Sequence, residues 1–224
     1  MRPGLWLVLF GAFAAQGLCI LGGAGTLDWP AAWAYLFVLS GSMVGLTVSL
    51  AQRDPALLAE RMRGTAQKGQ PLWDKIYASS LQLIWFGWLI LMGLDHRFGW
   101  SAMPGWLTWV GVASVALGFW IIHLTFLENS FLSPAVRVQS ERGHEVVSTG
   151  PYAIVRHPMY AGAMFLFAGT ALALGSWWGL LGGTLLELSV ASRILGEERV
   201  LRAGLAGYAD YADRVHYRLI PFVW

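Results

Sequence analysis

Six long runs of apolar residues constrain this chain more than any other feature. A helix that crosses a bilayer needs about 20 apolar residues. Only 12% of the residues are charged and 56% are hydrophobic, whereas soluble domains carry about 25% charged residues. The runs predict an all-α, polytopic integral membrane protein with about six transmembrane helices. They cover Leu5 to Leu21, Ala31 to Leu50, Ile76 to Leu94, Gly105 to Leu127, Met159 to Leu174 and Trp177 to Leu195.

The first and the last two runs leave some freedom in the number of spans. The first could be taken for a signal peptide, but its apolar stretch continues past Ala15 to Leu21, which favours a retained span. The last two runs are short and only Gly175 and Ser176 separate them, so they predict a tight helical hairpin. Four spans with a re-entrant last hairpin would give the same sidedness and stay an alternative.

The distribution of Lys and Arg predicts the orientation. With six spans, 14 of the 15 Lys and Arg residues fall on the side of the two termini, and only Arg97 falls on the other. Because cytoplasmic segments carry the excess of basic residues, we expect both termini and all long polar segments in the cytoplasm, with a bacterial inner membrane as the setting.

Charge and cysteine content exclude several classes of function. A net charge of +2 without a basic run gives no indication of a nucleic-acid partner. The single cysteine, Cys19, cannot form an internal disulfide. The five His residues show no metal-ligand spacing, so the sequence predicts neither a metal site nor a covalent nucleophile.

The stretch "TGPYAIVRHPMYAG", residues 149–162, places polar groups at the start of the fifth apolar run. Gly150 and Pro151 indicate a turn. Pro158 suits the first turn of a helix, where its missing N–H group has no cost. Arg156 and His157 would then lie just before a helix N-terminus, where free N–H groups and the helix dipole favour an anion.

Two further groups extend this stretch within the first helical turns. Tyr160 can donate a hydrogen bond, and Gly162 allows close approach of another group to the helix. Each residue alone has a structural explanation, as an interfacial anchor or a packing residue. Taken together, they favour a binding site.

Acidic residues and tyrosines follow in the last segment. Glu187 lies within an apolar run, where an ionisable group is expensive, and its role stays open. Glu197 and Glu198 lie near the interface and could form surface ion pairs with neighbouring Arg residues. Tyr208 and Tyr211 share a helical face, on an amphipathic helix that either lies on the membrane or roofs a pocket. Residues 51–75 are expected to be a solvated or interfacial connector.

The motifs "GPYAIVRHPMYAG", "GEERVL" and "YADYADRVHYRLIP" resemble the isoprenylcysteine carboxyl methyltransferase family, which is related to the phospholipid N-methyltransferases. The resemblance spans about residues 125–224. The segment "GLAGYADY" departs from the family pattern, which often has a phenylalanine and more acidic residues before the first tyrosine.

No repeat or low-complexity tract divides the chain, so we expect a single membrane domain over residues 1–224, with a transmembrane scaffold over 1–127. The resemblance implies a methyltransferase core over 128–224. It implies S-adenosyl-L-methionine as the cofactor and a lipophilic acceptor, prenylated or phospholipid, as partner. Arg156 and Glu198 would be catalytic, near the acceptor. The implied cofactor-binding residues are Gly150, Tyr152, His157, Tyr160, Gly162, Glu197, Tyr208 and Tyr211.

Several functions stay open on the sequence alone. A carboxylate acceptor needs no base and could be oriented by Arg156, whereas an amine acceptor needs one, for which Glu198 is the candidate. Carboxyl O-methylation of an isoprenylcysteine-like substrate is the first interpretation, and phospholipid N-methylation is the alternative. A membrane reductase of the sterol type that uses NADPH, or a non-enzymatic membrane protein, would be the remaining possibilities.

Overall fold

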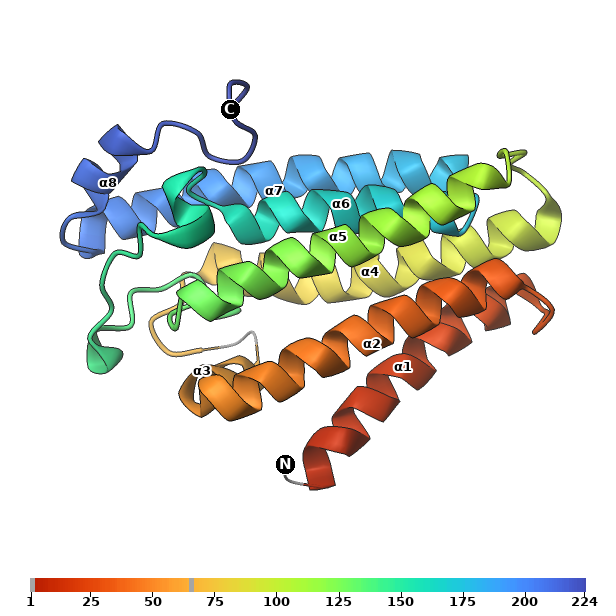
Figure 1. Ribbon diagram of the computed structural model, residues 1–224, viewed down its shortest axis with the longest axis horizontal. Helices are drawn as coiled ribbons and strands as arrows, with labels where there is room; N and C mark the ends of the chain where they lie inside the picture. Colours follow the sequence, from red (N-terminus) through yellow and green to blue (C-terminus); the bar gives the residue numbers. More distant parts are fainter. Residues whose placement is uncertain (1–2, 65–66) are drawn as a thin grey trace.

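The computed structural model describes residues 3–64 and 67–224, and Arg2 therefore lies outside it. The described residues form eight α-helices and two short 3-10 helices, without a strand, which confirms the all-α prediction (Figure 1). The elements are α1 Pro3–Ala24, α2 Pro30–Arg53, α3 Pro55–Met62, α4 Leu72–Phe98, α5 Trp106–Glu128, η1 Ser140–Arg142, η2 Gly150–Ala153, α6 Pro158–Ala173, α7 Trp177–Gly204 and α8 Tyr208–Arg214.

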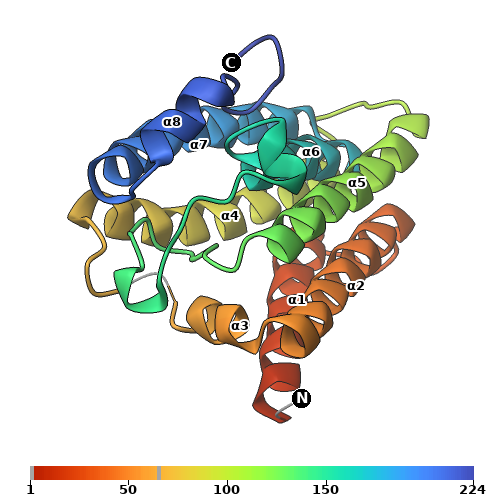
Figure 2. The ribbon, with the colours of Figure 1, turned by 60° about the vertical axis from the view of Figure 1, so that its left-hand side comes forward.

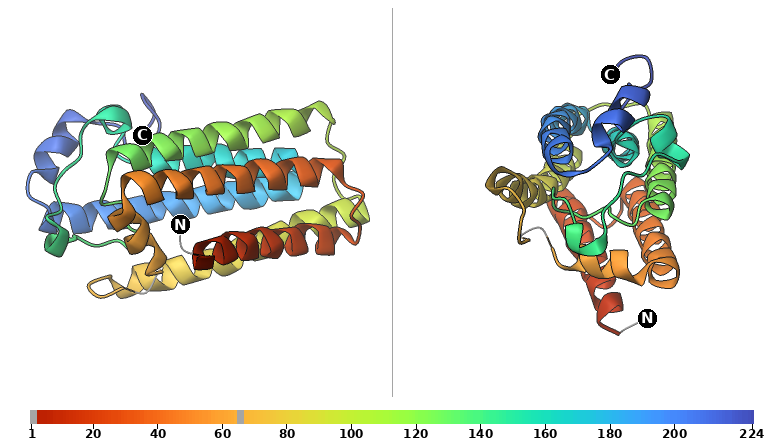
Figure 3. Two further views of the ribbon diagram at one scale, coloured as in Figure 1. Left: turned by 60° about the horizontal axis from the view of Figure 1, so that its bottom comes forward. Right: turned by 90° about the vertical axis from the view of Figure 1, so that its left-hand side faces the viewer.

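Four of the helices, α1, α2, α4 and α5, are long and apolar enough to cross a membrane. They match the first four apolar runs, with α5 beginning one residue after Gly105. Helix α6 is apolar but has only 16 residues, and α7 has 28 residues with a polar second half. The long helices lie roughly alongside one another (Figure 3).

Helices α5 and α6 contact through their backbones. A Cβ atom on Gly118 would lie 2.6 Å from the carbonyl oxygen of Gly162, and one on Gly111 would lie 2.2 Å from the backbone nitrogen of Ala173. Small residues permit this approach, which is a common way to pack membrane helices. The contact fixes where the N-terminus of α6 lies against the end of α5.

The α6–α7 hairpin is closed at its turn by a buried carboxylate. Gly175 has a φ of +66°, as a tight reversal requires. The Ser176 hydroxyl accepts a hydrogen bond from the Gly179 backbone nitrogen at 2.7 Å, and donates one to Asp95 of α4. The hairpin predicted at Gly175 and Ser176 is therefore present and tied to α4.

Polar segments gather at one end of the bundle, which we call the polar end: α3, residues 129–157 and α8 (Figures 1 and 2). Residues 51–75, expected to be a solvated or interfacial connector, include α3, which has one exposed and one buried side. Its Leu57 is fully buried and its Glu60 is 2% exposed, because α3 packs under the segment that follows α5. The C-terminal helix α8 is short, since it ends at Arg214 and residues 215–224 are not helical.

Candidate active site

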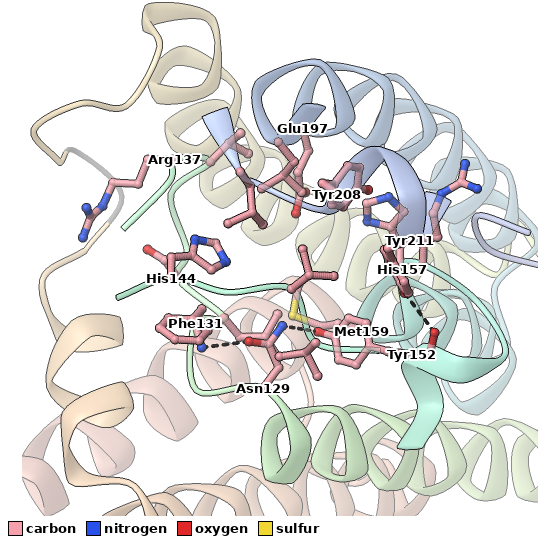
Figure 4. Close-up of a pocket in the computed structure, with 18 of the residues that line it drawn as sticks. Asn129, Phe131, Arg137, His144, Tyr152, His157, Met159, Glu197, Tyr208 and Tyr211 are labelled. Carbon is pink, nitrogen blue, oxygen red and sulfur yellow. Dashed lines mark hydrogen bonds between the residues drawn. The ribbon is translucent and has the colours of Figure 1, made fainter. Parts of the chain in front are cut away.

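A polar hollow lies at the polar end, beside the N-terminus of α6 (Figure 4). The volume open to a water molecule inside it is about 90 Å³, below the range of about 300–1,000 Å³ common for small-molecule sites. We call it the polar pocket. Its walls come from the segment after α5, the start of α6, the end of α7, and α8. Its polar and aromatic lining includes Asn129, Phe131, Arg137, His144, Tyr152, Arg156, His157, Tyr160, Arg193, Glu197, Tyr208 and Tyr211.

The entry to α6 is held by the C-terminal segment. Pro158 occupies the first helical position, as predicted, and His157 occupies the N-cap position without a capping hydrogen bond from its side chain. The backbone N–H groups of Arg156 and His157 donate to the carbonyl oxygens of Tyr217 and Arg218, both at 2.9 Å. These bonds satisfy the backbone where a helix start would otherwise leave donors free.

The Arg156 side chain repeats this connection. Its Nη1 donates to the carbonyl oxygens of Val215 at 2.7 Å and His216 at 3.0 Å. Its Nε donates to Glu198 Oε1 at 2.7 Å. Arg156 is 5% exposed. Its guanidinium thus binds the C-terminal segment and α7 at once.

The Glu198 carboxylate contacts three side chains that are, or can become, positively charged. Its Oε1 lies 2.7 Å from Arg156 Nε and 3.3 Å from His157 Nε2, and its Oε2 lies 3.0 Å from Arg218 Nε. Burial alone would raise its pKa, but hydrogen bonds and charges of His157 and Arg156 outweigh burial and lower the pKa to about 2. Glu198 is 4% exposed and does not line the polar pocket.

A second network runs from Glu197 to α4. Tyr160 donates from its hydroxyl to Glu197 Oε2 at 2.9 Å and accepts from Arg193 Nη1 at 3.0 Å. Arg193 Nε then donates to Asp74 Oδ1 at 2.9 Å, and Asp74 is fully buried. The Asp74 carboxylate also accepts from the backbone nitrogen of Val136 at 2.7 Å. The tyrosine on the pocket wall is thereby fixed by a buried ion pair.

Three tyrosines line the pocket between α5 and α8. Asn129 donates to the Tyr152 hydroxyl at 2.8 Å, and the Tyr211 hydroxyl donates to the Tyr152 carbonyl oxygen at 2.9 Å. Burial raises the pKa values of Tyr152 and Tyr211, so both are neutral phenols. The rings of Tyr208 and Tyr211 lie 5.8 Å apart, as their spacing predicted. Within the described part of the chain, the buried Tyr208 hydroxyl has no hydrogen-bond partner.

The wall farthest from α6 is aromatic. The rings of Phe131 and His144 stack with centroids 4.6 Å apart. Burial, with Arg142 and Arg137 nearby, lowers the pKa of His144 to about 4, so it is neutral at pH 7. This wall is supported from α3, because Glu60 accepts from Arg137 Nη2 at 2.9 Å.

A second hollow, which we call the apolar groove, opens on the flank of α6. Its volume is about 950 Å³, and it is lined by α5, η2, α6, Glu187 and residues 219–221. Its surface is almost wholly apolar. Pro158 lines both hollows. A polar pocket and an apolar groove thus meet at the first residue of α6.

Seven of the ten predicted site residues line the polar pocket. Gly150, with a φ of +55°, borders the apolar groove instead. Gly162 faces α5, where a Cβ atom would lie 2.7 Å from the Gly118 carbonyl oxygen, so its position is explained by helix packing. Glu198 lies behind the pocket, and its partners are Arg156 and Arg218 rather than the neighbouring Arg residues of α7.

Sequence reasoning missed the supporting residues Asp74, Arg193, Phe131, Arg137 and His144. The signal for Arg193 was its position inside an apolar run, which counts as a functional indication for an ionisable residue. Asp74 gave no comparable signal, because it lies 119 positions from Arg193 in the chain.

Comparison with known proteins relates the second half of the chain to membrane methyltransferases. A family model described as phospholipid methyltransferase matches residues 106–205. Two relatives from Oryza sativa, subspecies indica and japonica, are each named "Probable protein-S-isoprenylcysteine O-methyltransferase". Each is 31% identical over 121 residues, which is 52% of this chain and 62% of the relative. The chain thus matches less than two thirds of their length.

A solved structure supports the fold over a longer stretch. The eukaryotic intramembrane Ras methyltransferase, isoprenylcysteine carboxyl methyltransferase, superimposes with a TM-score of 0.59 at 22% identity. The match covers 93% of this chain and 74% of the other. The chain is related to the isoprenylcysteine carboxyl and phospholipid methyltransferases, and the resemblance predicted from its motifs is confirmed.

Proposed function

We propose that the protein is an integral membrane methyltransferase that uses S-adenosyl-L-methionine and methylates a lipophilic acceptor. The observation that carries this proposal is the meeting of the polar pocket and the apolar groove at Pro158. A polar donor and a lipid-borne acceptor need two unlike sites that share one wall.

The residues of the polar pocket suit S-adenosyl-L-methionine. The Glu197 carboxylate and the faces of Tyr152, Tyr208 and Tyr211 would hold a cationic ligand, since aromatic faces attract cations. The partnerless Tyr208 hydroxyl offers a hydrogen bond. The stacked Phe131 and His144 provide a flat wall for a base. When bound, the cofactor supplies an electrophilic methyl group on a positively charged sulfur.

Arg156 is the residue we propose for holding the acceptor. Its described hydrogen bonds use Nε and Nη1, which leaves Nη2 for an acceptor carboxylate at the pocket wall. Fixing two reactants in a productive geometry can supply about 7–11 kcal/mol of the barrier. Arg156 and His157 are held in place by Glu198, which we therefore assign as a positioning residue.

The low pKa of Glu198 favours carboxyl O-methylation over N-methylation. A carboxylate with a pKa of about 2 is a weak base at neutral pH, and an amine acceptor requires a base. We therefore propose an isoprenylcysteine-like carboxylate as acceptor, and phospholipid N-methylation as the alternative that the matching family model favours.

We also propose the finer membrane arrangement. Helices α6 and the first part of α7 would cross the bilayer as a short hairpin, which gives six spans. The polar end and both termini would be cytoplasmic, as the Lys and Arg distribution predicts. The proposed core, residues 128–224, depends on Asp74 and Glu60 from the preceding scaffold.

The experiment is incubation of membranes that contain the protein with methyl-labelled S-adenosyl-L-methionine, followed by treatment of the lipid product with alkali. An ester loses its label in alkali, whereas an N-methyl group keeps it. We expect a base-labile product. Calorimetry of the purified protein with the demethylated cofactor supplies an independent check, and the absence of binding heat would refute the proposal. Titration with NADPH tests the reductase alternative.

A further inference from the structure

Glu187 is a carboxyl group in an otherwise apolar groove. It lies on α7, is half-buried, and lines the apolar groove. Among the described residues, no hydrogen-bond donor or cation partners its side chain. In the proposed arrangement it lies ten residues after Trp177, or about 15 Å along the helix, close to the middle of a hydrocarbon core about 30 Å thick.

The pairing of α6 with α7 gives the position of Glu187 relative to Pro158, where the polar pocket and the apolar groove meet. Gly183 lies against the Phe167 carbonyl, and Arg193 bonds to Tyr160. Between these two contacts, Glu187 is level with residues 163–166 of α6. At 1.5 Å per residue, that level is about 8–12 Å from Pro158, where the groove meets the polar pocket.

The remaining lining explains what such a carboxyl can recognise. Among the described residues, the only other ionisable side chain on the groove is Glu128 at its polar end, where the Thr149 hydroxyl donates to it. The described part of the groove therefore offers two carboxyl groups and no cationic side chain. An ionisable group at membrane depth is costly and is typically retained for function.

We propose that Glu187 determines acceptor specificity by binding a hydrogen-bond donor, a hydroxyl or amine, carried within the lipophilic chain of the acceptor. This donor lies about 8–12 Å from the methylated atom. This inference rests on the proposed function, because only that function makes the lipid in the groove the methyl acceptor. The preferred acceptor is then a lipid with one internal polar substituent rather than a purely hydrocarbon chain.

The test measures binding and turnover separately, with the full chain in lipid nanodiscs. The probes are radiolabelled N-acetyl-S-hexadecylcysteine and analogues with one hydroxyl group at successive carbons of the alkyl chain. We expect one analogue to bind about two- to tenfold more tightly than the unsubstituted probe, the gain of one hydrogen bond. Glu187→Gln should keep this preference and Glu187→Leu should abolish it.

Leu185→Met serves as the matched control, because Leu185 is on the same helix, is exposed, and does not line the groove. It should keep the wild-type preference. Binding of the demethylated cofactor checks that each variant is folded. Equal binding of all analogues by the wild-type protein, or an unchanged preference in Glu187→Leu, overturns the inference. Discriminating binding without methyl transfer would show that Glu187 selects the lipid in the groove, but it would refute both the proposed function and the assignment of that lipid as a methyl acceptor.

Discussion

Replacement of Glu198 by Gln should destabilise the polar end by a predictable amount. The substitution keeps the size of the side chain and removes the charge that Arg156, His157 and Arg218 share. The pKa of Glu198 is lowered from 4.5 to about 2, and a tenfold change in an acid dissociation constant corresponds to about 1.36 kcal/mol. The expected loss is therefore about 3 kcal/mol, which agrees with the roughly 3–5 kcal/mol for breaking a buried ion pair.

The lowered pKa also predicts a pH dependence. Because the pKa of Glu198 is lower in the folded than in the unfolded protein, its stabilisation is complete above about pH 4.5 and is lost as the pH falls towards 2. The wild-type protein should lose about 3 kcal/mol of stability across this interval from this group. The Glu198→Gln protein should lack this part of the acid sensitivity.

Thermal unfolding of the detergent-solubilised protein, followed by tryptophan fluorescence at one scan rate, is the assay. For a chain of this size about 3 kcal/mol corresponds to a decrease in Tm of about 6–12 °C. Trypsin should also cleave more readily after Arg214 and Arg218, since the C-terminal segment loses a contact. Glu141→Gln is the control, because Glu141 is exposed and its partner Arg137 keeps its bonds to Glu60 and Gln67. If the Glu198→Gln protein has the same Tm as the wild type at pH 7, the role of Glu198 in stabilising the polar end is refuted.

Three further substitutions test other parts of the structure. Gly162→Leu should prevent α5 and α6 from packing, because even a Cβ atom would lie 2.7 Å from the Gly118 carbonyl oxygen; a monodisperse peak in size-exclusion chromatography would contradict this. Asp74→Asn leaves Arg193 buried without an anion and should lower the free energy of unfolding by about 3–5 kcal/mol, as measured by thermal unfolding. Adding Arg193→Met should restore this stability. Tyr160→Phe removes the hydrogen bonds to Glu197 and Arg193 and should weaken cofactor binding about two- to tenfold by calorimetry, whereas unchanged affinity would separate Tyr160 from the cofactor site.

The spans and the start of α6 could be predicted from the sequence because their signals are local. Apolar length marks a membrane helix, and Pro158 marks a first turn without reference to any distant residue. The tight turn at Gly175 and Ser176 is of the same kind. Each of these features follows from a few neighbouring residues.

The supporting contacts of the site could not be predicted, because they join positions far apart in the chain. Arg193 meets Asp74 across 119 positions, and Arg137 meets Glu60 across 77. Gly162 gave a correct local signal, close approach to the helix, but the sequence could not say whether a cofactor or α5 would approach. The two glutamates differ for the same reason: Glu197 faces Tyr160, whereas Glu198 faces Arg156 and Arg218.

The attachment of residues 215–218 to the start of α6 has a consequence for traffic through the site. Both the backbone and the guanidinium of Arg156 are hydrogen-bonded to these residues, so that side of the polar pocket is tied to the start of α6. If the polar pocket binds the proposed cofactor, we expect the spent cofactor to leave past Phe131 and His144, where the described chain between α5 and η2 has no regular helix longer than one turn. The proposed cofactor exit and the apolar groove would then lie on different sides of Pro158, so the spent cofactor could leave without passing through the membrane-facing groove.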